Sequence, residues 1–85
     1  MNIQFIESIE PTKENEKGQE PLFECQMSEQ PQKESLIEYK GSIYIVQQIM
    51  TRISEFDGVF SIRATAFVMH MDMYNKLRNR PIPGR

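Results

Sequence analysis

The chain has 85 residues, a formal net charge of −2 and a single cysteine, Cys25, which indicates one small domain and excludes an internal disulfide. Apolar residues make up 39% of it, a low share for a globular domain, so we expect a small core and a marginal stability that self-association would supplement. No apolar run is long enough to cross a bilayer, the N-terminus lacks the features of a signal peptide, and the lone cysteine suits a reducing compartment. We therefore expect a soluble, cytoplasmic protein.

The first half of the chain predicts short strands separated by polar loops. Residues 2–10 alternate apolar and polar side chains, as a strand does, although Ile6 and Ile9 also allow a helical turn. Residues 22–27 and 36–40 predict two further short strands. The segments 11–21 and 28–35 are polar and rich in Glu and Lys, so we expect flexible, acidic loops there.

The second half predicts a long β-hairpin with arms 42–54 and 59–71. The arms are rich in β-branched residues and flank "EFDG", whose Asp-Gly is a strong turn signal. A register that places Ser54 opposite Val59, and Ile45 opposite Val68, gives one face that is apolar nearly throughout. A slip by one residue mixes the faces, whereas a slip by two preserves them and stays open.

These elements predict a mainly β fold of about five strands, built around the long hairpin. Such long arms are expected to bend, giving a small curved antiparallel sheet or a barrel that in outline resembles SH3-like or OB-like barrels. We expect a short helix over 72–79, one β-rich domain over 1–75, and a basic C-terminal tail over 76–85.

The segment "VMHMDM" (68–73) raises the question of a metal site, because thioether and imidazole groups bind copper. In a strand, however, Met69, Met71 and Met73 share one face and His70 takes the other, so packing is the favoured interpretation and no metal or cofactor is expected. The pair Cys25 and His70 is the sole candidate for nucleophilic catalysis, and Cys25 alternates as a core residue does. We expect no catalytic residue and no enzymatic activity.

The leading functional hypothesis is a small binding or regulatory protein that contacts protein partners and forms a homo-oligomer, as a dimer. An apolar patch larger than so small a core can cover typically marks an interface. The sequence predicts that patch on the second face of the hairpin, from Tyr44, Val46, Phe67, Met69 and Met71.

The alternative hypothesis is a nucleic-acid-binding small β-barrel. Residues 1–40 contain nine glutamates and four lysines, whereas residues 41–85 contain six basic and three acidic residues. A basic second half suits a nucleic acid, and it also suits attraction to the acidic first half. The residues assigned to an anion are Arg52, Arg63, Lys76, Arg78 and Arg80. The sequence gives no sign of a membrane or a small-molecule substrate.

Overall fold

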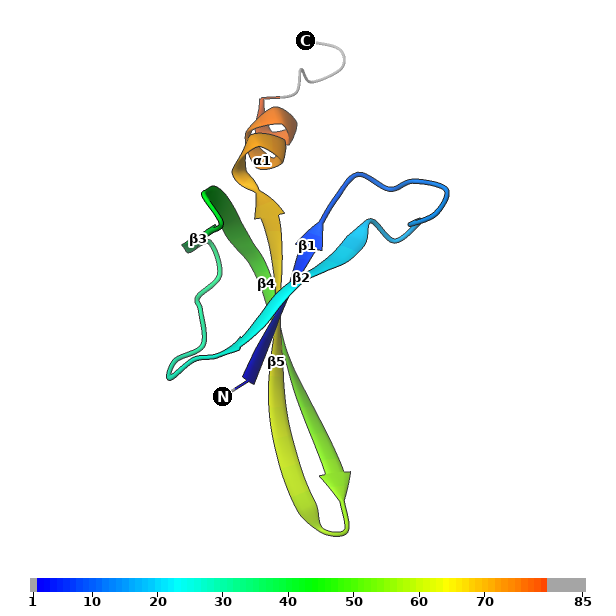
Figure 1. Cartoon of the computed structure of the whole chain (residues 1–85), viewed down its shortest axis with the longest axis vertical. Coiled ribbons are helices and arrows are strands. Elements are labelled where there is room, and N and C mark those ends of the chain that lie inside the picture. Colours follow the sequence, from blue (N-terminus) through cyan, green and yellow to red (C-terminus); the bar gives the residue numbers. More distant parts are fainter. Residues whose placement is uncertain (1, 80–85) are drawn as a thin grey trace.

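The structure, a computed structural model, describes residues 2–79; Met1 and residues 80–85 lie outside the description. Its elements are β1 (Asn2–Ser8), β2 (Gln19–Gln26), β3 (Leu36–Tyr39), β4 (Ser42–Phe56), β5 (Val59–His70) and α1 (Met71–Arg78). The strands form one sheet in the order β2-β1-β5-β4-β3, curled into a half-barrel (Figure 1). The predicted mainly β class with five strands and a short C-terminal helix is confirmed. One detail differs: β1 pairs with β5 in parallel, so the sheet is mixed and not purely antiparallel.

Two tight turns connect the last three strands. Asp57 and Gly58 have φ values of 50° and 76°, and Lys40 and Gly41 have φ values of 50° and 80°. Positive φ at both central residues is what the common two-residue hairpin turn requires, because its twist matches that of the flanking strands. The Asp-Gly signal therefore predicted the turn correctly, and β4 extends closer to it than the sequence indicated, to Phe56, whereas β5 begins at Val59 as predicted.

The β4–β5 register differs from the predicted one in two ways. Between the turn and Gln48 it is slipped by two residues, so that Phe56 lies opposite Val59. The pairing then shifts between Val46 and Gln48, which leaves Gln47 as an extra residue, a β-bulge. As a result Val46 lies opposite Val68, and the predicted pairing of Ile45 with Val68 is wrong.

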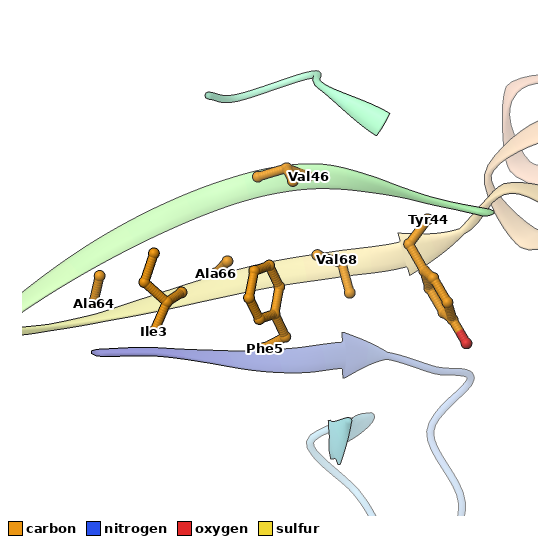
Figure 2. Close-up of a cluster of buried hydrophobic side chains, with 7 residues drawn as sticks. All are labelled: Ile3, Phe5, Tyr44, Val46, Ala64, Ala66 and Val68. Carbon is orange, nitrogen blue, oxygen red and sulfur yellow. The ribbon is translucent and has the colours of Figure 1, made fainter. Parts of the chain in front are cut away.

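The bulge decides which side chains form the core. Because a strand alternates its faces at every residue, one extra residue turns Tyr44 and Val46 onto the face of Ala66 and Val68. Strand β1, which pairs with the other side of β5, adds Phe5 to the same face, because its parallel register sets Phe5 beside Ala66. Figure 2 shows the resulting cluster of buried side chains, which is Ile3, Phe5, Tyr44, Val46, Ala64, Ala66 and Val68.

Hydrogen bonds close loop 9–18, which contains most of the segment 11–21 that was predicted to be a polar loop. The backbone N–H of Ile9 donates to the carbonyl of Gly18 over 2.8 Å. The Asn15 side chain donates to the carbonyl of Gln19 over 2.8 Å. Strand β2 then begins at Gln19, so residues 19–21 belong to the sheet and not to the loop. The polar side chains here satisfy the backbone locally, which apolar periodicity cannot reveal.

The C-terminal helix begins directly at the end of β5. His70 is its N-cap, and the Nδ1 atom accepts a hydrogen bond from the backbone N–H of Asp72 over 3.1 Å. The helix therefore starts one residue earlier than expected, and Asp72 lies in its first turn. In the described part of the chain, no helix has the length and apolarity that a membrane crossing requires.

Candidate functional site

The far half of the β4–β5 hairpin projects from the sheet as a two-stranded arm (Figure 1). On one side β1 follows β5 only as far as Arg63. On the other side β3 follows β4 as far as Ile45, and two further backbone hydrogen bonds reach Val46. We call residues 51–63 the hairpin arm, and every residue in it is exposed.

The hairpin arm displays large apolar side chains to solvent. Phe56 is 80% exposed, Ile53 66% and Phe60 64%. Together with two neighbours on β5, the exposed apolar set of the arm is Ile53, Phe56, Val59, Phe60 and Ile62. Single exposed apolar residues are ordinary, but a contiguous group of them marks an interaction site.

These apolar side chains occupy both faces of the arm. Ile53 lies opposite Ile62, with Phe60 in the next row of the same face. Phe56 and Val59 lie opposite each other on the reverse face, next to the turn. A free two-stranded hairpin is marginally stable in water, so the arm depends on the continuation of its strands into the sheet.

The apolar patch predicted from the sequence is not an exposed surface. Val46 is fully buried, and Tyr44 and Met69 are buried as well, whereas Phe67 and Met71 are half-buried. The bulge at Gln47 turns Tyr44 and Val46 to the core face and so separates them from the other three. The interpretation of these residues as an exposed patch is therefore wrong. The sequence places Ile53, Phe60 and Ile62 on the apolar face of the hairpin but carries no signal that this part of the face is exposed.

The basic residues assigned to an anion are only partly brought together. Arg52 and Arg63 lie directly opposite each other on the arm, and both are exposed. Within residues 2–79 neither arginine has an ion pair, so the predicted pairing with the acidic first half is not seen. Lys76 and Arg78 are in the last turn of α1, and Arg80 lies outside the described residues.

The "VMHMDM" segment is divided between two elements. Met69 ends the buried part of β5, and the Gln47 amide donates to its sulfur over 3.9 Å. Since the helix begins at Met71, the expected single strand face for Met69, Met71 and Met73 does not form. His70 packs edge-to-face on Tyr44, with ring centroids 5.3 Å apart. Among residues 2–79 no group of three or more His, Cys, Asp or Glu side chains is arranged to hold a metal ion.

Cys25 and His70 are not brought together. Cys25 pairs with Ile3 on β1, and Ile3 pairs with Ala64 on β5. His70 is six residues further along β5 than Ala64, at the opposite end of the sheet. Cys25 packs half-buried against the core cluster, as its alternating pattern predicted.

Two hollows lie elsewhere on the surface. One, with a volume of about 830 Å³, lies between the start of loop 9–18 and α1. Its lining includes Pro11, Met73 and Leu77. The other, of about 360 Å³, lies between β2 and β3, where Phe23 and Tyr39 form part of its wall. The charged residues that border them, such as Lys76 and Glu38, are exposed, so neither hollow offers a buried charge to orient a ligand.

Comparisons with protein-family models, with curated proteins and with solved structures found no match. The function is therefore inferred from the geometry and chemistry of the arm.

Proposed function

We propose that the chain is a small, non-enzymatic binding or regulatory protein of the cytoplasm that contacts a protein partner through the hairpin arm. The observation that supports this proposal is the exposure of five large apolar side chains on an element that lies outside the core cluster. Burying such surface against a partner is favourable and needs no specific charge. The single thiol of Cys25 is compatible with a reducing compartment.

The size of the exposed set limits what it can contribute to binding a partner. Burying one Val, Ile or Phe side chain completely contributes about 1.5–3 kcal/mol, so the five contribute on the order of 10 kcal/mol together. Association costs about 4–15 kcal/mol in lost translational and rotational freedom. A stable complex therefore cannot rest on these side chains alone and needs further contacts, such as backbone hydrogen bonds to the partner.

The position of the arm makes it available without disturbing the fold. The core cluster is formed by β1, by β4 up to Val46 and by β5 from Ala64 onward. No residue between 51 and 63 belongs to it. Substitutions in the arm are thus expected to change binding and to leave the half-barrel intact.

A second candidate function, binding of a nucleic acid, is supported by two observations. Arg52 and Arg63 lie directly opposite each other without an acidic partner among the described residues, and like charges in such a pair are unfavourable unless an anion is bound. Against it, Glu55 and Asp57 lie at the tip of the same arm. Of the aromatic side chains of the hairpin, Tyr44 is buried, whereas Phe56 and Phe60 are exposed on the arm, where they are available for base stacking.

Site-specific photo-cross-linking tests the proposed function. A photoreactive phenylalanine analogue introduced at Phe60 lies on the arm, and the same analogue at Glu29 lies on an exposed loop far along the chain. In living cells we expect a protein adduct from position 60 and none from position 29. Absence of any adduct from position 60 contradicts the proposal.

A further inference from the structure

The outer edge of β4 is an unprotected strand edge. In residues 2–79 no strand pairs with β4 on that side between Gln48 and Phe56, since β3 and the segment before it extend only to Val46. Unpaired N–H and C=O groups along such an edge are a template for another strand.

The outermost strands of the sheet are blunted, and the free edge of β5 within the described residues spans only residues 59–62, whereas this edge of β4 is neither blunted nor short. Strand β2 carries Pro21 and an irregularity in its pairing with β1 next to it, both of which oppose a further strand. Strand β3 has only four residues. In contrast, residues 48–56 contain no proline, glycine or lysine and include the exposed Ile53 and Phe56.

We propose that a second copy of this chain pairs with this edge, β4 against β4 in antiparallel orientation, with the two-fold axis at Ile53. The inference rests on the proposed function and names the partner of the hairpin arm. The two arms then form a continuous intermolecular sheet, in which the strand order through the interface is β5-β4-β4-β5.

The side chains along β4 select the register. In a two-fold antiparallel pair one residue faces its own copy, and the residues on either side of it face each other across the axis. An axis at Arg52 sets two arginines opposite each other, and an axis at Glu55 sets two glutamates opposite each other. Both registers are disfavoured by like charges in direct cross-strand contact.

Of the two registers between these, the one centred on Ile53 gives the better pairs. An axis at Ser54 places the apolar Ile53 of one copy opposite the carboxylate of Glu55 of the other copy. An axis at Ile53 instead pairs Ile53 with itself and, on the other face, pairs Met50 with Phe56 twice by symmetry. Apolar and sulfur–aromatic pairs of this kind are favourable across strands.

The charges of the arm also fit a second copy better than an anionic partner. The base of the arm is positive, with Arg52 and Arg63, and its tip is negative, with Glu55 and Asp57. Antiparallel arms bring the acidic tip of one copy within about one Debye length, roughly 10 Å, of the arginines of the other. A polyanion is attracted by the two arginines but repelled by the carboxylates of Glu55 and Asp57.

Cysteine cross-linking tests the register. In a Cys25→Ser background, Ile53→Cys places two thiols on the axis, where the Cα atoms of an antiparallel pair are about 4.5–5.5 Å apart, a separation that a disulfide accepts. Thr51→Cys is the matched control on the same face, because four residues, about 13 Å, separate it from its own copy. A mixture of Thr51→Cys with Glu55→Cys is the positive control, because these residues face each other.

Mild oxidation is expected to link most of the Ile53→Cys protein into a dimer, and about tenfold less of the Thr51→Cys protein. The Thr51→Cys and Glu55→Cys mixture is expected to give the mixed dimer. Equal linkage of all single variants overturns the register. A wild-type chain that stays monomeric in sedimentation velocity at high concentration overturns the pairing itself.

Photo-cross-linking at Phe56, which the proposed register sets opposite Met50 of the second copy, separates failure of this inference from failure of the proposed function. An adduct with twice the mass of the chain supports both. An adduct with a different protein, from a chain that is monomeric in sedimentation, overturns the self-pairing and leaves the arm a binding element. No adduct at all overturns both.

Discussion

The ring of Phe23 on β2 stacks on the ring of Tyr39 on β3, with centroids 4.2 Å apart and an interplanar angle of 18°. These strands are the two edges of the open sheet, and no strand pairing joins them. Phe23 also stacks on the buried Phe5, with centroids 4.4 Å apart. A column of three aromatic rings thus connects the two edges of the half-barrel through side chains alone.

Removing the rings of this column is expected to lower the free energy of unfolding. A double-mutant cycle with Phe23→Leu and Tyr39→Leu should give a coupling of about 0.5–1.5 kcal/mol, the usual contribution of an aromatic pair beyond its buried area. Urea denaturation followed by circular dichroism provides the four free energies. Tyr39→Phe keeps the ring and should change stability by less than about 0.5 kcal/mol; additive effects of the two leucine substitutions contradict the stacking.

Deletion of Gln47 is expected to preserve cooperative folding. Because Gln47 is the extra residue of the bulge, its removal leaves Val46 opposite Val68 in a regular ladder and keeps Tyr44 and Val46 on the core face. The substitution Gln47→Ala keeps the extra residue and should also retain a cooperative thermal transition. A deletion variant that loses this transition, while Gln47→Ala keeps it, contradicts the placement of the bulge at Gln47.

Two glycine substitutions separate backbone strain from steric overlap. Gly18 and Gly41 both have positive φ, 65° and 80°, so alanine is strained at either position. A Cβ at position 18 also meets the carbonyl oxygen of Ile9 at 2.6 Å, whereas at position 41 it meets nothing within 4 Å. Gly41→Ala should therefore cost about 1–2 kcal/mol and Gly18→Ala distinctly more. Equal losses in denaturant unfolding contradict the close approach of Gly18 to Ile9.

Shortening the hairpin arm is expected to leave the half-barrel folded. Because Arg52 and Arg63 pair directly, residues 53–62 can be replaced by Asn-Gly, which forms the required two-residue turn. At low protein concentration the shortened chain should unfold with a free energy within about 1 kcal/mol of the wild type, since surface changes outside the core have small effects. Loss of the cooperative transition contradicts an arm that serves only for contact.

The sequence predicts the elements better than their mutual placement. The turn at Asp57 and Gly58 carries a local signal, and so does the alternation of β-branched residues in β4 and β5. The bulge at Gln47 has no such signal, because a polar residue within an apolar strand is equally compatible with regular pairing. That one residue reversed the assignment of Tyr44 and Val46 from the predicted patch to the core.

Local sequence patterns could not predict the parallel pairing of β1 with β5, for another reason. It joins residues about sixty positions apart, such as Ile3 and Ala64. Which strand pairs with the side of β5 opposite β4 depends on the arrangement of the whole sheet. The exposed arm follows from that choice, since among residues 2–79 the pairing of β1 with β5 runs only from Arg63 to Val68. Periodicity predicts that Ile53 and Ile62 share a face. It does not predict that this part of the face is exposed to solvent.

Amide hydrogen exchange along β4 tests the central claim, that the hairpin arm is a binding element completed by a second copy, most directly. Those amides between Gln48 and Phe56 that point away from β5 have no partner strand among residues 2–79 of one chain. Nuclear magnetic resonance should show their protection rising with protein concentration, while core amides such as that of Val68 stay protected throughout. Outward amides that exchange rapidly at every concentration contradict the pairing.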